Sequence, residues 1–283
     1  MIVDAHHHLW QRARHDHGWL DAPGMEAIDR DFTVADLAAA TTAADSDAGE
    51  VGATVAVQAL NSSAETYDLL ASAGPVGAVV GWVDLISSRC GTRLDQLAAA
   101  PGGGKLRGLR HLVQDEPDPR WLVRPSVLRG LSSAAEHRLA FDLLVRGPQR
   151  AAALEAARRL PDASFVIDHA GKPNIGAGEW EPWAAWITDM AALPHVACKL
   201  SGLVTECPPR PWSRALIEPY AQHVLAAFGA DRVMFGSDWP VCLLHASYHE
   251  VLGLTVDLLD GASPTEREAV LGGTARRVYR LSA

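Results

Sequence analysis

Residues 2–10 read IVDAHHHLW, a short apolar start followed by an aspartate, three histidines and a second apolar pair. The apolar start predicts a β-strand over 2–6. Residues two apart in a strand point to the same side, so we expect His6 and His8 to share one side and His7 to face away. No G-x-G-x-x-G motif follows this strand, and that motif is typical of dinucleotide-binding open sheets. The stretch therefore favours a closed barrel over an open, doubly wound sheet.

The same pattern, a short apolar run that ends in polar residues, recurs along the chain. Most of the runs are apolar throughout, which is typical of strands covered on both faces of a parallel sheet. Stretches rich in alanine and leucine separate them and predict helices. The predicted strands are 2–6, 53–58, 77–83, 106–111, 140–145, 164–168, 196–200 and 233–236. The predicted helices are 33–44, 63–74, 147–160, 180–193, 213–229 and 264–271.

The number of strands and the chain length together predict the architecture. Eight strands that alternate with helices are typical of an α/β protein of the (β/α)8 TIM-barrel class, which takes about 250 residues, and this chain has 283. No low-complexity linker divides the chain, so we predict a single domain over 1–283. The longest predicted loops are 9–31, 114–129 and 201–213. In a barrel such loops follow the carboxyl ends of strands, where active sites are built.

The composition argues against several classes of protein. Hydrophobic residues make up 48% of the chain, as expected of a globular protein, and the net charge of −9 argues against a nucleic-acid partner. The sequence has neither a signal peptide nor a long apolar run, so we expect a cytoplasmic protein without membrane contact. The four cysteines lack CxxC spacing, which is typical of reduced thiols rather than of a zinc ribbon. We expect a monomer or a small homo-oligomer.

Residues with catalytic or metal-binding chemistry follow several predicted strands. His169 comes after FVID and Asp238 after VMFGS, so both join His6 and His8 at the carboxyl-end rim of the barrel. Imidazole and carboxylate groups are typical ligands of a divalent cation. Each residue also has a plain structural interpretation, as a hydrogen-bonded histidine at a strand end or as an N-cap aspartate. Four such residues on one rim favour the functional interpretation.

Several long blocks of the sequence resemble one known family. The blocks are DAHHHLWQ (4–11), GLRHLVQ (108–114), FDLLVR (141–146), VIDHAGKP (166–173), KLSGLVTE (199–206) and FGSDWPVCLLHASY (235–248). They are similar to the amidohydrolase superfamily and, within it, to the amidohydrolase-2 branch that contains L-fuconolactonases and L-rhamnonolactonases. The similarity covers essentially the whole chain. It implies a hydrolase that opens a sugar lactone, L-fucono- or a related aldonolactone with a 1,4 or 1,5 ring, to the aldonic acid.

The resemblance also bears on the metal. The block GLRHLVQ has no lysine that could be carbamylated to bridge two ions, so we predict at most one divalent ion, with zinc the first choice. Relatives in this branch can also work without metal, so a second version stays open, in which the histidines with Arg110 or Lys172 donate hydrogen bonds to the oxyanion. No organic cofactor is expected. The candidate metal ligands are His6, His8, His169 and Asp238.

A lactone hydrolase needs a base that activates water and a pocket that binds hydroxyl groups. Asp238 is the predicted base: it would take a proton from the water and return it to the ring oxygen as that oxygen leaves. His6, His8 and His169 would polarise the carbonyl. Aromatic faces pack on sugar C–H surfaces, whereas amides and charged groups bind hydroxyls. The predicted substrate-binding residues are Trp19, Gln58, Trp82, Arg110, His111, Asp142, Lys172 and Trp239.

Three alternatives remain at this point. Metal-dependent decarboxylases of aromatic or unsaturated acids in the wider branch use the same histidines and aspartate. Arg107 and Arg110 would suit a carboxylated or sulfonated lactone, because arginine pairs well with such anions. A barrel that binds a ligand without catalysis is the third alternative, and the presence of all four candidate residues argues against it.

Overall fold

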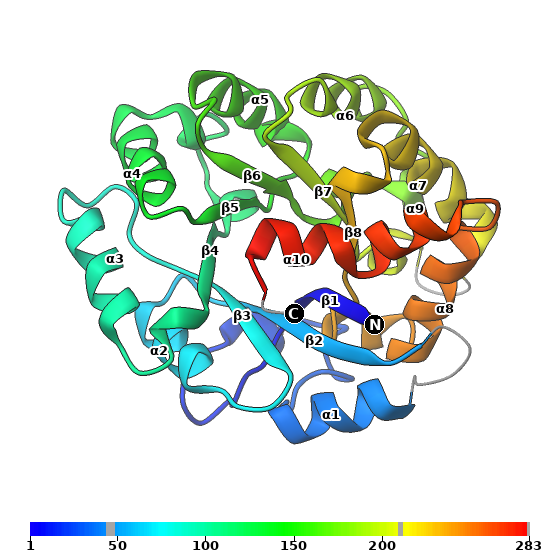
Figure 1. Ribbon diagram of the computed structural model, residues 1–283, viewed down its shortest axis with the longest axis horizontal. Coiled ribbons are helices and arrows are strands. Elements are labelled where there is room, and N and C mark those ends of the chain that lie inside the picture. The colour runs from blue at the N-terminus through cyan, green and yellow to red at the C-terminus, as the bar shows by residue number, and fades with distance from the viewer. Residues whose placement is uncertain (44–48, 209–211, 282–283) are drawn as a thin grey trace.

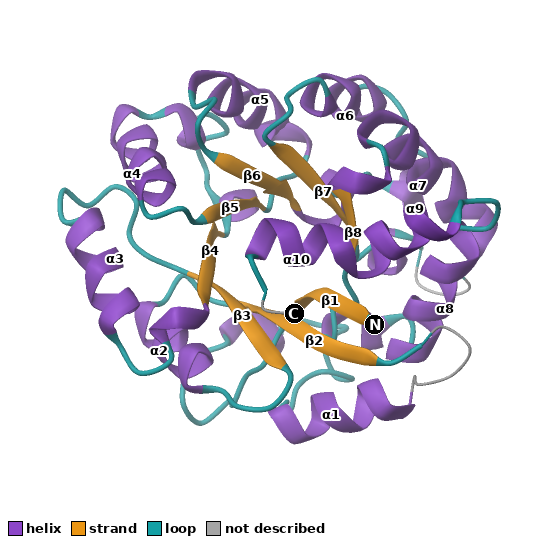
Figure 2. Ribbon diagram, in the orientation of Figure 1, coloured by secondary structure: helices purple, strands orange, loops and turns teal. Residues whose placement is uncertain are grey.

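Eight parallel strands form a barrel with helices on its outside (Figure 1). The computed structural model describes residues 1–43, 49–208 and 212–281. The strands pair in chain order around the barrel, and Figure 2 shows helices alternating with them, which confirms the predicted (β/α)8 fold. The strands are β1 (Ile2–His7), β2 (Val51–Val57), β3 (Val76–Gly81), β4 (Leu106–His111), β5 (Ala140–Leu143), β6 (Ser164–Ile167), β7 (Val196–Leu200) and β8 (Val233–Phe235).

The helices pack around the strands, except for the last one, which lies across the centre of the barrel (Figure 1). Within the described residues, no helix is both long enough and apolar enough to cross a membrane. The helices are α1 (Val34–Ala43), α2 (Ser63–Ala71), α3 (Cys90–Ala99), α4 (Pro125–Glu136), α5 (Arg150–Arg159), α6 (Trp183–Ala191), α7 (Arg214–Phe228), α8 (Tyr248–Leu258), α9 (Pro264–Glu268) and α10 (Thr274–Tyr279).

The strands agree with the sequence prediction more closely than the helices do. Every predicted strand is present, and its ends move by at most two residues. The predicted loop over 114–129 is wrong in its last part, because Pro125 begins α4; proline suits the first turn of a helix, where its missing N–H has no partner to lose. Helices α3, α4, α8 and α10 have no predicted counterpart. The end of the predicted helix at residue 44 and loop residues 209–211 lie outside the described residues.

Backbone hydrogen bonds join the end of the last strand to the first. The amide of Asp238 donates to the carbonyl of His6 at 2.8 Å, and the amide of His8 donates to the carbonyl of Trp239 at 2.7 Å. These bonds close the barrel at the seam between β1 and the segment that follows β8. They also hold the backbones of four candidate site residues, His6, His8, Asp238 and Trp239, in one arrangement.

The first strand contains a β-bulge just before its histidines. The pairing of β1 with β2 shifts by one residue between Asp4 and His7. Ala5 packs in the apolar cluster inside the barrel, yet the next residue, His6, also points inside, where it meets residues from other strands. A bulge re-aims side chains in this way and is common beside active sites. Beyond it, His6 and His8 face inward and His7 faces β2, as expected from the sequence.

A column of buried polar side chains runs through the inside of the barrel. The hydroxyl of Tyr279, on α10, donates to the carboxylate of Asp142 on β5, with both oxygens at 2.9 Å. The ammonium of Lys199 on β7 lies 2.5 Å from the same carboxylate. All three side chains are fully buried. The column therefore attaches the C-terminal helix to the strands through a charged hydrogen-bond network.

We predict that Tyr279→Phe lowers the free energy of unfolding by about 1–3 kcal/mol, because it leaves a buried carboxylate short of one donor. Tyr67→Phe is the matched control, since Tyr67 is 41% exposed on α2 and should tolerate the change. Urea denaturation followed by circular dichroism measures both. Equal stability of the two variants would show that the Tyr279 hydroxyl does not support the column.

Candidate active site

Three ligand-type atoms converge at the mouth of the barrel. The Nε2 atoms of His6 and His8 lie 3.2 Å apart, and Oδ1 of Asp238 lies 3.7 Å from the first and 3.4 Å from the second. Nε2 of His169 lies 3.9 Å from the same carboxylate oxygen. All four side chains are buried. The structure therefore brings together the four residues that the sequence places on one rim.

Hydrogen bonds at the outer ring nitrogens indicate where the histidine lone pairs lie. Nδ1 of His8 lies 2.8 Å from a backbone carbonyl at the end of β2, and because a carbonyl only accepts, Nε2 of His8 holds the lone pair. Both ring nitrogens of His6 face groups that only donate, Nε2 facing Nη1 of Arg110 at 3.3 Å and Nδ1 facing Nζ of Lys199 at 3.1 Å, so either nitrogen can hold the lone pair. Burial lowers the pKa of both histidines and keeps the rings neutral. When the lone pair of His6 lies on Nε2, it faces the lone pair of His8 across 3.2 Å, and a cation or a proton between the two nitrogens would stabilise that arrangement.

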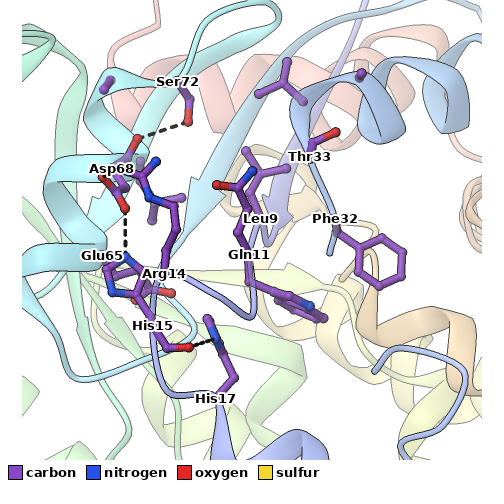
Figure 3. A pocket seen from close by; sticks show the side chains of 15 residues that line it. Leu9, Gln11, Arg14, His15, His17, Phe32, Thr33, Glu65, Asp68 and Ser72 are labelled. Atoms are coloured by element: carbon purple, nitrogen blue, oxygen red, sulfur yellow. Dashed lines mark hydrogen bonds and ion pairs between the residues drawn. The ribbon is translucent and has the colours of Figure 1, made fainter. Parts of the chain in front are cut away.

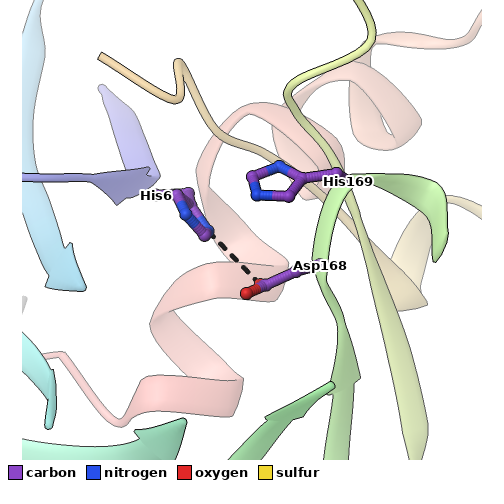
Figure 4. A group of neighbouring side chains, drawn as sticks. All are labelled: His6, Asp168 and His169. Atoms are coloured by element: carbon purple, nitrogen blue, oxygen red, sulfur yellow. Dashed lines mark ion pairs between the residues drawn. The ribbon is translucent and has the colours of Figure 1, made fainter. Parts of the chain in front are cut away.

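Residues 168 and 169 both point into the barrel mouth, although they are neighbours in the chain. Figure 4 shows that the side chains of Asp168 and His169 both point toward His6. His169 has a left-handed backbone with φ of 53°, which is strained for this residue type and is typical of functional sites. Its Nδ1 lies 2.9 Å from the hydroxyl of Ser201. A Cβ on Gly202 would lie 2.6 Å from the same nitrogen, so position 202 requires glycine.

Asp168 connects the histidines to the buried column. Its carboxylate lies 3.3 Å from Nδ1 of His6, 3.0 Å from Nζ of Lys199 and 3.0 Å from Nη1 of Arg110. Burial acts to raise the pKa of Asp168, but Lys199, His6 and Arg110 outweigh it and hold the pKa well below its usual range. Asp142 shares Lys199 with Asp168, and burial raises the pKa of Asp142 to about 6. A buried carboxylate behind a histidine fixes the orientation of the ring.

Asp238 is held in the conformation that faces this cluster. Its φ of 56° is left-handed, and its amide bonds to the carbonyl of His6 across the barrel seam. Burial acts to raise its pKa, but His169, His8 and Lys172 together hold the pKa below its usual value. The side chain is therefore a carboxylate at neutral pH, as a general base must be.

A cavity of about 290 Å³ borders the cluster. This volume is close to the lower limit for pockets that bind small molecules. Besides His8, His169 and Asp238, its walls include apolar and polar side chains from several loops. They are Trp19, Ala59, Arg110, Leu112, Gln114, Asp115, Leu144, Lys172 and Val241.

Three of the eight predicted substrate-binding residues line this cavity, namely Trp19, Arg110 and Lys172. The other five do not line it, and Asp142 belongs to the buried column inside the barrel. Arg107, the second candidate for an anionic substrate, does not line the cavity and bonds to its neighbour's carbonyl at the start of β4. The roles of these residues in substrate binding remain predictions.

The remaining four residues contact one another or the core. The amide of Gln58 donates to the carbonyl of Arg110 at 3.1 Å, and the guanidinium of Arg110 donates to the carbonyl of Gln58. Nε1 of Trp82 donates to Nδ1 of His111 at 3.0 Å. Trp239 is buried in the core beside Phe32, with ring centroids 5.1 Å apart. Trp239 is therefore a core residue in this structure.

Sequence reasoning missed Asp168, Ser201 and Gln114 as site residues. Asp168 lies two residues after Val166, which packs inside the barrel. Because every second residue of a strand faces the same side, this spacing indicates that Asp168 points inward. Gln114 accepts a hydrogen bond from Nζ of Lys172 at 2.9 Å, a contact between two loops that no local pattern predicts. Ser201 bonds to His169 because β6 and β7 are neighbours in the sheet.

A second cavity of about 390 Å³ lies between the loop after β1 and helices α1 and α2. Figure 3 shows Arg14 and His15 reaching Asp68 at one side of it, with nitrogen-to-oxygen distances of 2.9 Å and 2.8 Å. The described residues around it include no group of three metal-ligating side chains. Both candidate metal-binding groups of the described residues lie at the barrel mouth.

Comparison with known proteins assigns the family. A family model described as amidohydrolase matches residues 3–281. The chain belongs to the amidohydrolase family. This amidohydrolase is 39% identical to a curated L-fucono-1,5-lactonase of Burkholderia ambifaria, over 99% of this chain and 95% of that protein. It is 38% identical to an L-fucono-1,5-lactonase of Burkholderia multivorans, over 99% and 96%.

Solved structures agree with this family assignment. A crystal structure of an amidohydrolase from Burkholderia multivorans with bound zinc has a TM-score of 0.91 and 38% identity, and the match covers 100% of both chains. A second crystal form of that protein, with bound HEPES, has a TM-score of 0.90. Two 5-carboxyvanillate decarboxylases, 12% and 11% identical, share the fold of this amidohydrolase.

The residues of this amidohydrolase fit a divalent metal ion. Two groups of buried side chains could each hold an ion, because the ligand atoms within each group all lie within 4.8 Å of one another. One group is His6, His8 and Asp238, and the other is His6, Asp168 and His169. The first group offers two neutral imidazole nitrogens and a carboxylate, which are typical zinc ligands. An ion there would take the place of the contact between Arg110 and Nε2 of His6.

We predict that the protein binds about one zinc ion per chain and that His8→Gln weakens the affinity at least about 100-fold, since one ligand is lost. His7→Gln is the matched control, because Nε2 of His7 bonds to Thr54 at 2.9 Å and faces away from the cluster. Isothermal titration calorimetry measures both affinities. Zinc binding that survives in His8→Gln, or is absent in the unchanged protein, would contradict this assignment.

Proposed function

We propose that the protein hydrolyses a sugar lactone, an L-fucono- or related aldonolactone with a 1,4 or 1,5 ring, to the aldonic acid. The observation that carries the proposal is the ionised carboxylate of Asp238, which faces three neutral histidines beside a cavity of about 290 Å³. The names of the two Burkholderia relatives support it. One domain over 1–283, a cytoplasmic location and a monomeric or small homo-oligomeric state remain predictions.

In the proposed reaction Asp238 accepts a proton from the attacking water and later returns it to the ring oxygen of the lactone. The neutral His169, held by Ser201, borders the cavity beside this carboxylate. Lys172 places its ammonium group on the cavity wall, where it can stabilise the charge that develops on the carbonyl oxygen. A metal held by His6, His8 and Asp238, with His169 close by, would polarise the carbonyl as a Lewis acid.

The contacts of Arg110 favour a neutral lactone over an anionic one. Its guanidinium is buried and already donates to Asp168, His6 and Gln58, so few of its donors are free to bind a substrate carboxylate. The ammonium group of Lys172 already donates one hydrogen bond to the side-chain oxygen of Gln114. The apolar part of the wall would suit the carbon face of a sugar ring.

We expect Asp238→Asn to lower kcat on L-fucono-1,5-lactone by about 100- to 10,000-fold, because the general base is lost. The control is Asp231→Asn, the same chemical change at an exposed position. A proton-release assay with a pH indicator, run with and without chelator, measures both variants over a panel of aldonolactones. The proposal fails if no lactone is opened above the spontaneous rate, or if Asp238→Asn retains full activity. Release of carbon dioxide from an aromatic acid would instead identify a decarboxylase.

Trp19 offers a second prediction about the same cavity. Its indole Nε1 is buried with no hydrogen-bond partner among the described residues, although the side chain lines the cavity. We expect this group to donate to a substrate hydroxyl. Trp19→Phe should then raise KM about 5- to 30-fold, the effect of one lost hydrogen bond, with kcat changed less than about twofold.

The matched control is Trp180→Phe, because Trp180 is 42% exposed, packs beside Tyr220 of α7 and does not line the cavity. Steady-state kinetics on the best lactone of the panel measures both variants. An unchanged KM in Trp19→Phe would remove the indole nitrogen from substrate binding.

A further inference from the structure

A third cavity, of about 300 Å³, lies at the opposite end of the barrel from the candidate active site. We call it the basal cavity. Its walls are the first residues of β5, β6 and β7 together with α10, the helix that lies across the barrel in Figure 1. Its polar wall residues are Arg138, Ser164, His195, Arg232, Arg277 and Arg280.

Three of the four arginines of the basal cavity, Arg232, Arg277 and Arg280, donate to backbone carbonyls, and none of the four forms an ion pair with a carboxylate of the described residues. Nη1 of Arg232 lies 3.1 Å from the carbonyl of Leu193. Arg277 donates to the carbonyl of Asp231, and Arg280 donates to the carbonyl of Arg138. A carbonyl oxygen accepts a hydrogen bond but does not neutralise a charge. Each guanidinium has five N–H donors, so most of the donors here are free for a ligand.

The arginine ion pairs within the described parts of the chain all lie elsewhere. Arg12, Arg110, Arg150 and Arg214 are examples, each within 3.1 Å of a carboxylate. The basal cavity therefore concentrates positive charge in a protein whose net charge is −9. Burial lowers the pKa of Arg280, and repulsion by the positive charges of Arg107 and Arg138 lowers it further.

We propose that the basal cavity binds a small anion with two or more negative charges, of the phosphate or carboxylate class. The planar guanidinium fork matches the oxygens of both groups and forms paired, charge-assisted hydrogen bonds with them. A cleft lined by charges of one sign also raises the local concentration of the opposite ion. Such an anion would supply the counter-charge that the neighbouring side chains do not, and it would join α10 to the starts of three strands.

The test is isothermal titration calorimetry of the full chain with pyrophosphate and, separately, with citrate, at an ionic strength kept constant with sodium chloride. We expect saturable binding of at least one of the two, and a rise in Tm with the same anion. Arg277→Gln combined with Arg280→Gln should weaken that binding about tenfold or more, because each removes charge-assisted hydrogen bonds. Pyrophosphate binding identifies the phosphate class, and citrate binding the carboxylate class.

The matched control combines Arg89→Gln with Arg93→Gln, which makes the same change of charge at two exposed arginines of the α3 region. This control should keep the affinity of the unchanged protein. Both probes also bind metal ions, but heat from that source would persist in the Arg277/Arg280 double variant. The proposal is overturned if neither anion binds beyond the effect of ionic strength, or if the two double variants bind equally. Lactone hydrolysis should be unchanged in both, so this result and the test of the proposed function are independent.

Discussion

The fold and the candidate active site both depend on the ion pairs that the ammonium group of Lys199 forms with two buried carboxylates. The ammonium group lies on β7 inside the barrel, fully buried, between the carboxylates of Asp142 and Asp168. Asp142 extends the contact to α10, and Asp168 extends it to His6. Removing one partner from such a buried network leaves an uncompensated charge, which costs about 3–5 kcal/mol. The position of His6 is therefore coupled to the packing at the opposite end of the barrel.

The backbone contributes as much to the site as the choice of side chains. Regular strands would place every second residue inside the barrel, which limits how many groups can meet at its mouth. The bulge in β1 turns His6 inward directly after Ala5, and the left-handed conformation of His169 brings it beside Asp168. Asp238 is left-handed as well. Conformations of this kind cost energy and persist where the surrounding hydrogen bonds hold them in place.

These features explain how far the sequence predicts the structure. The barrel and its eight strands follow from short apolar runs, because periodicity and burial are local signals. His6, His8, His169 and Asp238 follow from their places after strands. The sequence does not show which side chains line the cavity. Gln58, Trp82, His111 and Trp239 have suitable chemistry but do not line it, because contacts with other parts of the fold decide their direction.

The helices were predicted less well for a related reason. Most of the stability of a helix in a protein comes from packing on the rest of the fold, a contribution that a local sequence pattern does not encode. Tyr279 makes this concrete for α10. Its ring and hydroxyl are fully buried on Asp142, a residue 137 positions earlier in the chain, and no local pattern encodes that distance.

The buried charges also bear on why this interior is polar at all. Most members of the apolar cluster inside the barrel are valine or alanine. Replacing a buried charged network by apolar residues of similar volume often leaves the free energy of unfolding equal or higher. Charges in the column are thus explained better by what they orient than by what they stabilise. Lys199 and Arg110 hold Asp168, Asp168 faces Nδ1 of His6, and Nε2 of His6 faces Asp238. Each step fixes the direction of the next group, and the last one is the carboxylate that the proposed hydrolysis requires.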